Sequence, residues 1–351
     1  MKVLQLIDSL HPGGAERMAV TIANALVSHN VASYLCTTRE EGLLKQQLKA
    51  EVYYFHLKKN GALDMAALLR LRAFVLEHKI TIIHAHTTSY FFATLLKISY
   101  PKLMLIWHEH QGNRISTTRT ENPILYICSF FYSRIITVND ALQRWCTKNL
   151  AVKSVVYLPN FVLSFNLDLK LIRNKRIVCL ANLKFPKNHQ LLLKAFAIVH
   201  LKYPDWKLQL VGKDYKDTYS TNLRLAITGK INESIIFTDS GDAVEEILLA
   251  SAIGVLSSNS EGLPVALLEY GVAALAVVCT DVGQCRDVID GYGKIVPPHD
   301  AEALAQAILF YIENEAMRIS DGLAFSRHIL KNYADDAIIP KLLDIYKETG
   351  K

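Results

Sequence analysis

The 351-residue chain has no cysteine pair at metal-binding or redox spacing, because its six cysteines are scattered and no CxxC motif occurs. Scattered cysteines are typical of reduced thiols and argue against a disulfide frame or a zinc site. Long apolar runs are also absent. Lys97, Pro101 and Lys102 interrupt the longest one, between residues 90 and 107, which argues against a membrane span. The apolar stretch at residues 3–7 is too short for a signal core, so we expect a cytoplasmic protein.

The charge is spread unevenly along the chain. Residues 1–165 contain 18 Lys+Arg and 10 Asp+Glu, a balance of +8, whereas the remainder contains 21 and 23, a balance of −2. A basic first half suits a polyanionic or lipid-phosphate acceptor, or a negatively charged membrane surface, and charge alone fits an ordinary solvated surface equally well. We expect no nucleic-acid partner.

Short apolar runs alternate with helix-period segments in two successive series, and the length of the chain suits two domains. The expected strands are 3–7, 32–37, 52–55, 81–86, 103–108, 135–138 and 155–158, then 176–181, 207–211, 234–238, 253–257, 276–279 and 293–296. The expected helices include 16–28, 62–78, 141–149, 189–202, 243–250, 264–273, 301–314 and a final helical segment 326–351. This alternation predicts an α/β protein with two doubly wound, Rossmann-like parallel-sheet domains that face each other across a cleft.

Ligands of such sheets bind beyond the carboxyl ends of the strands, which singles out four motifs. Gly13 and Gly14 follow the first strand and open a helix, where backbone amides could approach an anion, although a plain turn explains them too. Histidines end two neighbouring strands: His84 and His86, then His108 and His110. They suit contacts to sugar hydroxyls or phosphate, or are hydrogen-bonded core residues; without an HExxH motif we expect no metal.

The second domain opens with a strand followed by a loop that contains Lys184 and Lys187. Lysines in a first strand-to-helix loop could clamp a diphosphate, although most lysines are simply solvated. The position of the loop favours the functional interpretation, above all for Lys187.

The strongest signal lies between Ser257 and Glu269. We expect Gly262 to allow an unusual turn, Pro264 to start a helix, and Glu269 to be buried within that helix. A buried carboxylate requires a partner, and a ribose diol is a good one. Glu261, in the loop, could reach the sugar, whereas the alternative is a capping acid and a core ion pair.

These residues, in this order, resemble the family 4 retaining glycosyltransferases of the GT-B fold. The Glu-x7-Glu pattern of that family is present as Glu261 to Glu269, its Gly-Gly-Ala-Glu loop as residues 13–16, and its strand-end asparagine as Asn160. The resemblance covers nearly the whole chain. It departs at Asn182, where the family usually has arginine, and we expect Lys184 to supply the second positive charge.

The resemblance implies a donor domain (166–328), an acceptor domain (1–165) and a final helix (329–351) that packs back on the first domain. It implies that Glu269 holds the ribose, that Lys187, Lys184 and the Gly13–Gly14 loop hold the diphosphate, and that Glu261 with the amides after it holds the sugar. The implied donor-binding residues are Gly13, Gly14, Asn182, Lys184, Lys187, Gly212, Glu261, Gly262, Leu263, Val265 and Glu269, with residues 239–244 also framing the base. The implied catalytic residues are Glu261, Lys187 and His108, with His84, His86 and His110 on the acceptor side.

The function that we expect is retaining transfer of a hexose or N-acetylhexosamine from a nucleoside-diphosphate sugar, without metal or other cofactor. The acceptor would be a glycan or polyprenyl-linked molecule in cell-surface polysaccharide synthesis, reached by peripheral contact with the inner face of the cytoplasmic membrane. Two alternatives stay open: a nucleotide-sugar epimerase on the same fold, and a non-catalytic partner subunit of another transferase, which the loss of arginine at Asn182 would suit. A phosphorylase would need a pyridoxal-phosphate lysine, and no recognisable context for one is present.

Overall fold

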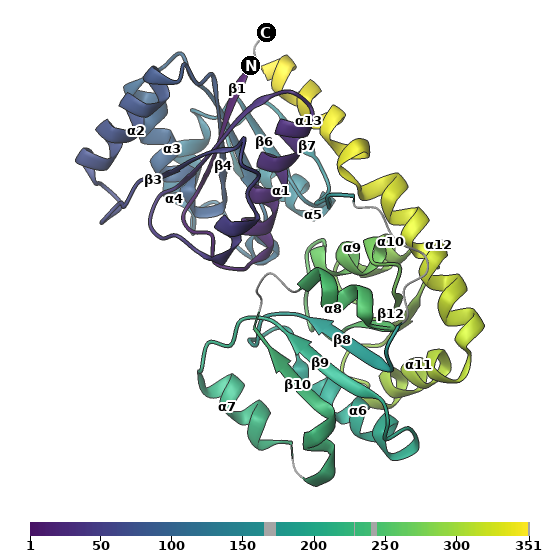
Figure 1. Cartoon of the computed structure of the whole chain (residues 1–351). Helices are drawn as coiled ribbons and strands as arrows, with labels where there is room; N and C mark the ends of the chain where they lie inside the picture. The colour runs from purple at the N-terminus through teal and green to yellow at the C-terminus, as the bar shows by residue number, and fades with distance from the viewer. Residues whose placement is uncertain (165–172, 228, 240–243, 350–351) are drawn as a thin grey trace. The chain divides into compact units, whose positions relative to one another are not determined.

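The computed structural model describes residues 1–164, 173–227, 229–239 and 244–349. The chain divides into two compact units: unit 1 is Met1–Leu163 with Asp335–Lys351, and unit 2 is Ser164–Ala334. Sequence reasoning placed the corresponding boundaries after residues 165 and 328. Figure 1 shows the elements of each unit.

Unit 1 is built on a seven-stranded parallel sheet with the order β3-β2-β1-β4-β5-β6-β7. Its strands are β1 (Lys2–Ile7), β2 (Ala32–Thr37), β3 (Tyr53–His56), β4 (Ile82–His86), β5 (Met104–Glu109), β6 (Arg134–Thr137) and β7 (Val155–Tyr157). Every expected strand of the first half is present, with each end within one residue of its prediction. Prediction succeeds here because strands covered on both faces form short continuous apolar runs.

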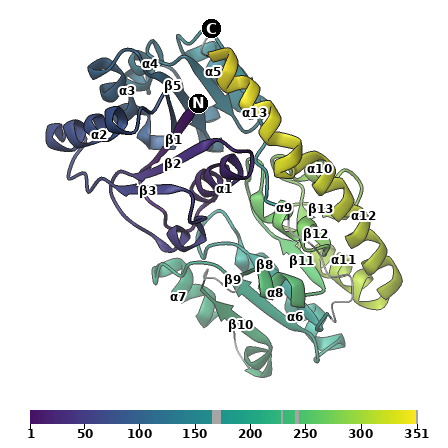
Figure 2. The same ribbon diagram turned by 45° about the horizontal axis from the view of Figure 1, so that its top comes forward.

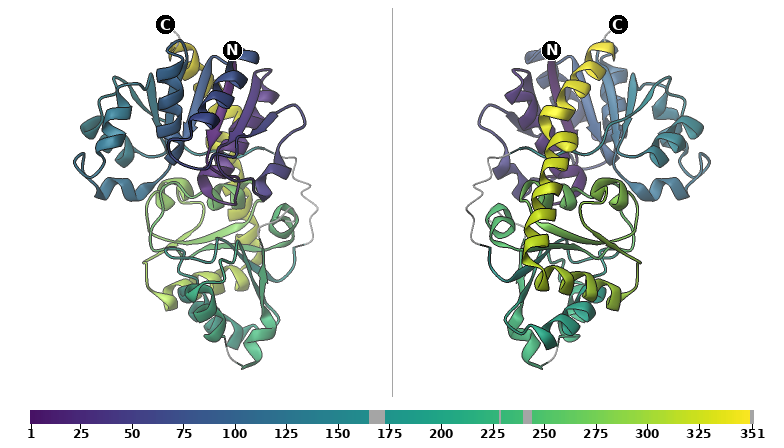
Figure 3. Two further views of the ribbon diagram at one scale, coloured as in Figure 1. Left: turned by 90° about the vertical axis from the view of Figure 1, so that its left-hand side faces the viewer. Right: turned by 90° about the vertical axis from the view of Figure 1, so that its right-hand side faces the viewer.

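Helices cover both faces of this sheet. The helices of unit 1 are α1 (Gly14–Ser28), α2 (Met65–Glu77), α3 (Tyr90–Ser99), α4 (Pro123–Ser129), α5 (Asp140–Asn149) and α13 (Asp335–Thr349). Right-handed crossovers put α1 on one face and α2, α3 and α4 on the other, because the connections run toward opposite edges of the sheet (Figures 1 and 2). The last helix, α13, lies beside α1. In Figure 3 it is behind the strands of unit 1 in the left view and in front of them in the right view.

Unit 2 contains a six-stranded parallel sheet with the order β10-β9-β8-β11-β12-β13. Its strands are β8 (Arg176–Leu180), β9 (Lys207–Val211), β10 (Ile235–Thr238), β11 (Ile253–Leu256), β12 (Ala276–Thr280) and β13 (Lys294–Val296), each again within one residue of its prediction. The helices are α6 (His189–Lys202), α7 (Thr218–Leu225), α8 (Val244–Ala250), α9 (Val265–Val272), α10 (Cys285–Ile289), α11 (Ala301–Glu313) and α12 (Glu315–Tyr333). The expected single helix over 326–351 is two helices, because Ala334 is extended between α12 and α13.

The prediction of two doubly wound parallel-sheet domains is confirmed. Each sheet reverses its strand order at one place, between β1 and β4 in unit 1 and between β8 and β11 in unit 2. Open α/β sheets bind ligands at such switch points, beyond the carboxyl ends of the strands. Within the described residues, no helix has both the length and the apolar character that crossing a membrane requires.

Candidate functional site

The switch point of unit 2 is held open by a tyrosine. β8 pairs with β11 through Ile177 and Val178, whereas beyond them Tyr270 of α9 bridges the two strands. Its hydroxyl donates to the Val255 carbonyl at 3.1 Å and accepts from the Leu180 N–H at 2.7 Å. Because Tyr270 is fully buried, these bonds fix α9 against the strand ends. Sequence reasoning missed Tyr270, since its hydroxyl gave no local signal.

Lys187 and Glu261 meet directly at this switch point. The Lys187 Nζ lies 2.7 Å from the Glu261 Oε1, and the Ser258 hydroxyl donates to the same oxygen at 2.5 Å. The Glu261 side chain is 9% exposed and that of Lys187 is 25% exposed. The two loops are joined further by the Asn259 N–H, which donates to the Pro186 carbonyl at 2.8 Å. Two residues predicted from separate motifs thus form one charged pair.

A glycine outside the predicted motif shapes this loop. Gly283, which follows β12, has a φ of +55°, and a Cβ there would lie 2.1 Å from the carbonyl oxygen of Glu261. The next residue, Gln284, donates its N–H to the Gly262 carbonyl at 3.1 Å. The expectation of an unusual turn at Gly262 is wrong as to the residue, because the left-handed backbone lies at Gly283 in the neighbouring loop and not at Gly262. Only a residue without a side chain allows the approach of the two backbones.

Helix α9 differs in detail from the expectation. It begins at Val265, with Pro264 as an extended N-cap residue, and Glu269 is half-buried instead of buried. The reason is helical spacing, since Glu269 shares the partly exposed side of the helix with Val265, four residues earlier, whereas Leu267 and Leu268 face the core. No side chain caps the helix start, so the first-turn amides suit an anion or sugar oxygens.

Asn182 and Gly212 connect the ends of β8 and β9. The Asn182 Oδ1 accepts from the Lys213 N–H at 3.0 Å, and a Cβ on Gly212 would lie 2.1 Å from the carbonyl oxygen of the residue before Asn182. Lys184 is exposed, with its Nζ 5.7 Å from the centre of the Tyr215 ring. The structure thus gives Asn182 and Gly212 structural tasks and puts the Lys184 charge beside an aromatic ring. Residues 240–243 of the expected base-framing loop lie outside the described residues.

His189 anchors the Lys187 loop. Its ring nitrogens contact the Tyr219 hydroxyl at 3.0 Å and the Ala181 carbonyl at 3.3 Å. Burial, opposed by the bond to Ala181 and reinforced by the charge of Lys187, lowers the pKa of His189 to about 4. The imidazole is therefore neutral near pH 7 and ties the loop to α7. Sequence reasoning did not single it out, because a lone histidine at a helix start is unremarkable.

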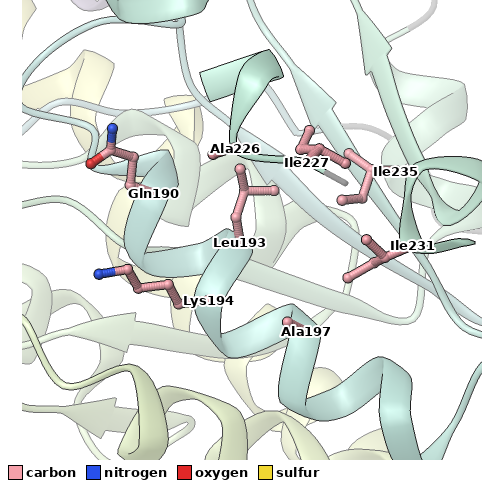
Figure 4. A pocket seen from close by; sticks show the side chains of 8 residues that line it. All are labelled: Gln190, Leu193, Lys194, Ala197, Ala226, Ile227, Ile231 and Ile235. Atoms are coloured by element: carbon pink, nitrogen blue, oxygen red, sulfur yellow. The ribbon is translucent and has the colours of Figure 1, made fainter. Parts of the chain in front are cut away.

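The pocket in Figure 4 lies apart from this charged pair, on the side of unit 2 formed by α6 and the residues that follow α7. It has a volume of about 470 Å³, and its wall is mostly apolar. The residues that line it are Gln190, Leu193, Lys194, Ala197, Ala226, Ile227, Ile231 and Ile235. None of the predicted donor-binding residues contributes to it.

The four predicted histidines of unit 1 form one stacked cluster at the ends of β4 and β5. His84 Nε2 and His108 Nδ1 share a hydrogen bond of 3.1 Å, and His86 Nδ1 and His110 Nε2 share one of 3.0 Å. The other ring nitrogen of each β4 histidine is also hydrogen-bonded. His84 Nδ1 lies 2.6 Å from the hydroxyl of Tyr346 in α13, and His86 Nε2 lies 2.9 Å from the side-chain oxygen Oε1 of Gln5, a buried residue of β1. His84 and His86 are thus core residues with both nitrogens satisfied.

Burial keeps these histidines neutral. It lowers the pKa of His84 to about 3 and those of His86 and His108 well below their usual value, and the neighbouring imidazoles act in the same direction. Ring nitrogens of His84, His86 and His108 lie within 4.8 Å of one another, so the cluster has the donor atoms for a transition metal. The expectation of no metal remains a prediction. The buried Nε2 of His108, like the Nδ1 of His110, has no hydrogen-bond partner among the described residues, so each has an unused position for a hydrogen bond to a ligand.

A buried ion pair lies next to His108. The carboxylate of Glu109 bonds the guanidinium of Arg114 and also accepts from the Gln111 N–H at 2.8 Å. Burial raises the pKa of Glu109, and Arg114 opposes this shift. The Arg114 guanidinium also lies 5.6 Å from the centre of the Trp107 ring, so the pair stiffens the loop after β5. Arg114 was missed because its partner is identified only by the tertiary contact.

Asp8 connects the two sides of the switch point in unit 1. It follows β1 and accepts from the Thr38 hydroxyl at 2.5 Å, beyond β2, and from the Thr88 hydroxyl at 2.6 Å, beyond β4. The Nζ of Lys59, beyond β3, lies 3.9 Å from Asp8 and 4.6 Å from the centre of the Phe92 ring. Burial lowers the pKa of Lys59, and Asp8 opposes that shift. Sequence reasoning passed over both residues, although Asp8 directly follows a predicted strand and Lys59 lies three residues beyond the end of β3.

The Gly13–Gly14 loop opens α1 as expected. Gly13 is the N-cap residue, in extended conformation, and Gly14 is the first helical residue. The carboxylate of Glu16 folds back over Gly13, with Oε2 at 2.3 Å from where a Cβ would be. An acid in the first turn stabilises the helix, so an anion at this loop would have to displace Glu16.

Comparison with known proteins agrees with this architecture. The profile described as Glycosyltransferase Family 4 matches residues 12–162, and the profile described as Glycosyl transferases group 1 matches residues 174–314. An uncharacterized glycosyltransferase of Haemophilus influenzae is 25% identical over 284 residues, 76% of this chain and 78% of the relative. The O-antigen biosynthesis glycosyltransferase WbnH of Escherichia coli is 23% identical over 335 residues, 92% of this chain and 94% of the relative. The crystal structure of Anabaena Alr3699/HepE in complex with UDP-glucose has a TM-score of 0.82 at 17% identity and covers 99% of this chain and 100% of that one.

Two doubly wound parallel sheets with polar residues at both switch points are typical of proteins that bind ligands at these strand ends. The two matched profiles cover both units, and the structural neighbours have the GT-B fold. The chain therefore belongs to the family 4 glycosyltransferases, and it is a glycosyltransferase of the GT-B type.

Proposed function

We propose that the chain transfers a hexose or N-acetylhexosamine, with retention of anomeric configuration, from a nucleoside-diphosphate sugar to a glycan or lipid-linked acceptor in cell-surface polysaccharide synthesis. The observation that carries the proposal is the Lys187–Glu261 pair at the switch point of unit 2, 2.7 Å apart. A cation and an acid in contact there suit a diphosphate and a sugar bound side by side. The relatives named for O-antigen synthesis support the polysaccharide context.

In the proposed donor complex, Glu269 accepts from the ribose hydroxyls and the α9 amides contact sugar or phosphate oxygens. Lys187 turns from Glu261 toward the diphosphate, and Glu261 becomes available to a sugar hydroxyl. The bond between the anomeric carbon and the diphosphate oxygen breaks as the acceptor oxygen attacks from the same face. The acceptor proton passes to the leaving diphosphate, whose negative charge Lys187 stabilises. No metal or other cofactor takes part in this scheme.

Unit 1 is proposed to bind the acceptor. The buried Nε2 of His108 is available to a hydroxyl group, and Lys59 offers a cation that burial has partly desolvated. Asp8 lies within reach of Lys59 and supplies a carboxylate at the same edge of the sheet. One cation, one acid and one neutral imidazole together suit an acceptor that combines hydroxyls with a phosphate.

A donor screen with matched lysine variants tests the proposal. The protein would be heated with UDP-, GDP- and ADP-sugars in turn, beginning with UDP-glucose because it occupies a solved structure of similar fold. A bound donor raises the melting temperature. We expect Lys187→Ala and Glu269→Gln to remove that rise and Lys184→Ala, an exposed lysine three residues from Lys187, to retain most of it. Absence of any rise with every donor, with Glu269→Gln indistinguishable from wild type, would contradict the proposal.

Turnover assays test the finer claims. Transfer products would be examined by NMR for the anomeric configuration, which should match that of the donor. Chelator should leave the rate unchanged. An inverted product or a chelator-sensitive rate would refute retention or metal independence without affecting donor binding.

One observation favours a second candidate, a non-catalytic partner subunit. Asn182 occupies the position of the family arginine and is engaged with the Lys213 N–H, while Lys184 lies by the Tyr215 ring. Among the described residues, Lys184 could supply a second cation close to the Lys187–Glu261 pair only by reorienting away from the Tyr215 ring. Donor binding without turnover in the presence of any tested acceptor would support this alternative.

A further inference from the structure

The loop that carries Lys187 is joined to the loop that carries Glu261 by bonds other than their ion pair. The Asn188 Nδ2 donates to the Asn259 Oδ1 at 2.7 Å, and the Asn259 N–H donates to the Pro186 carbonyl at 2.8 Å. Asn259 therefore holds the first loop on both sides of the lysine. We call the side-chain bond between Asn188 and Asn259 the asparagine clasp.

The backbone of Asn188 suits this contact. Its φ of +49° lies in the left-handed region, which asparagine adopts more readily than most residues. Its Oδ1 accepts from the Leu191 N–H at 3.3 Å and so caps α6. The two ends of one amide thus have separate partners, because the oxygen caps the helix and the nitrogen reaches the loop after β11.

The clasp lies beyond the point where β8 and β11 pair with each other. These strands pair through Ile177 and Val178, and the Tyr270 hydroxyl occupies the space between their ends. Past the tyrosine, the buried Ser257 hydroxyl donates to the Lys187 carbonyl at 3.1 Å and adds a further bond between the loops. Bonds between the loops therefore determine where the Lys187 backbone lies.

Donor binding should make the clasp more important. In the proposed complex the Lys187 amine leaves Glu261 for the diphosphate, so the ion pair no longer joins the loops. A displacement of about 1 Å in a group that acts on the reacting atoms costs up to about a hundredfold in rate. We propose that Asn188 and Asn259 are positioning residues, which hold the Lys187 backbone in place while its amine changes partner. The inference rests on the proposed function, because it concerns the action of Lys187 on the donor diphosphate.

Replacement of the two asparagines by aspartate tests the clasp. In Asn259→Asp the carboxylate still accepts from the Asn188 amide, and in Asn188→Asp it still caps α6 and accepts from the Asn259 amide once that amide turns over. The double variant places two carboxylates together with no hydrogen between them. Binding would be measured by calorimetry with the nucleotide sugar that the thermal screen selects among UDP-, GDP- and ADP-glucose. We expect each single variant to bind it within about threefold of wild type, and the double variant at least about tenfold more weakly than the product of the single effects.

Two controls separate the position of the loop from charge and from stability. Asn188→Gly with Asn259→Ala removes the clasp without adding charge, and glycine keeps the left-handed backbone. We expect this double variant to bind the donor as weakly as Asn188→Gly alone, because the first loss already breaks the bond. Tyr311→Phe removes a hydrogen bond to Asp321 between α11 and α12 of unit 2, and it should leave donor binding unchanged.

Amide hydrogen exchange without donor reports on the clasp alone. Residues 184–191 should exchange at least about tenfold faster in the double aspartate variant than in wild type or Tyr311→Phe. Unchanged exchange, or donor affinities in which the aspartate effects simply multiply, would overturn the proposal. Failure of the wild type to bind any of the three nucleotide sugars, with the exchange difference intact, would refute the donor site and leave the clasp as an element that only orders the loop.

Discussion

Acidification should destabilise unit 1 more than unit 2, because unit 1 holds a cluster of four neutral histidines. His84, His86 and His108 are at most 1% exposed, and burial lowers the pKa of each. A histidine whose pKa is lower in the folded state takes up its proton first in the unfolded chain. Its stabilising effect is therefore complete above the unfolded pKa and is lost as the pH falls from about 6.5 toward the folded value, about 3 for His84.

As long as the pH stays above the pKa of the folded state, the loss of stability is set by how far the pH lies below the pKa of the unfolded state. One pH unit below about 6.5, each such histidine costs about 1.4 kcal/mol of stability. Together with His110, whose pKa burial also lowers to about 3, four histidines give a loss of about 5–6 kcal/mol in unit 1 at about pH 5.5, a large part of a typical stability of about 5–15 kcal/mol. Among the described residues of unit 2, His189 is the fully buried counterpart and should cost about 1.4 kcal/mol; burial also lowers the pKa of the partly buried His328. Glu109 acts in the opposite direction, because its pKa is raised.

The three tryptophans allow each unit to be monitored separately. Trp107 and Trp145 lie in unit 1 and Trp206 in unit 2, so Trp206→Phe restricts the fluorescence signal to unit 1. Urea unfolding of that variant at about pH 7.5 and about pH 5.5 gives the two free energies to compare. Replacing both tryptophans of unit 1 by phenylalanine gives the matching measurement for unit 2.

A variant that removes one titrating group checks the cause. His86→Gln should reduce the loss in unit 1 by about 1.4 kcal/mol, whatever it does to stability at about pH 7.5. A loss of less than about 1 kcal/mol in unit 1, or equal losses in the two units, would show that the histidines are not neutral in the folded core.

Three further predictions concern single contacts. Tyr270→Phe removes both bonds that bridge β8 and β11, so unit 2 should lose about 1–3 kcal/mol in urea unfolding, and an unchanged midpoint would show that the bridge is dispensable. Gly283→Ala should destabilise unit 2 and abolish the donor-induced thermal shift, whereas Gly291→Ala, at φ +83° with no atom within 4 Å of the new Cβ, should cost only backbone strain; equal effects would refute the close approach to Glu261. Lys59→Met should raise the acceptor KM at least about tenfold and leave donor binding unchanged, and unaltered acceptor kinetics would remove Lys59 from the acceptor site.

The positions of the strands could be predicted from the sequence because the signal for them is local. Apolar runs such as residues 253–257 reveal a strand without knowledge of its neighbours, and thirteen strands were placed to within one residue at each end. Once a strand is placed, the sequence also gives the polar residues at and after its carboxyl end. Lys187, Glu261 and the strand-end histidines could therefore be named in advance. Helices with less regular patterns, such as α3 and α4, were not predicted from the sequence, because tertiary packing determines which of their sides is buried.

The pairing of side chains was decided by the tertiary structure. Glu261 is 74 residues from Lys187, and His84 is 262 residues from Tyr346, yet each pair is hydrogen-bonded. Asp8, Tyr270 and Gly283 acquire their roles in the same way, from loops and strands that are distant in the chain. Sequence pattern alone identified where each strand ends and which polar residues follow it. Which of those residues meet depends on the order in which the strands join the sheet, because strands that are adjacent in the sheet bring their carboxyl-end loops together.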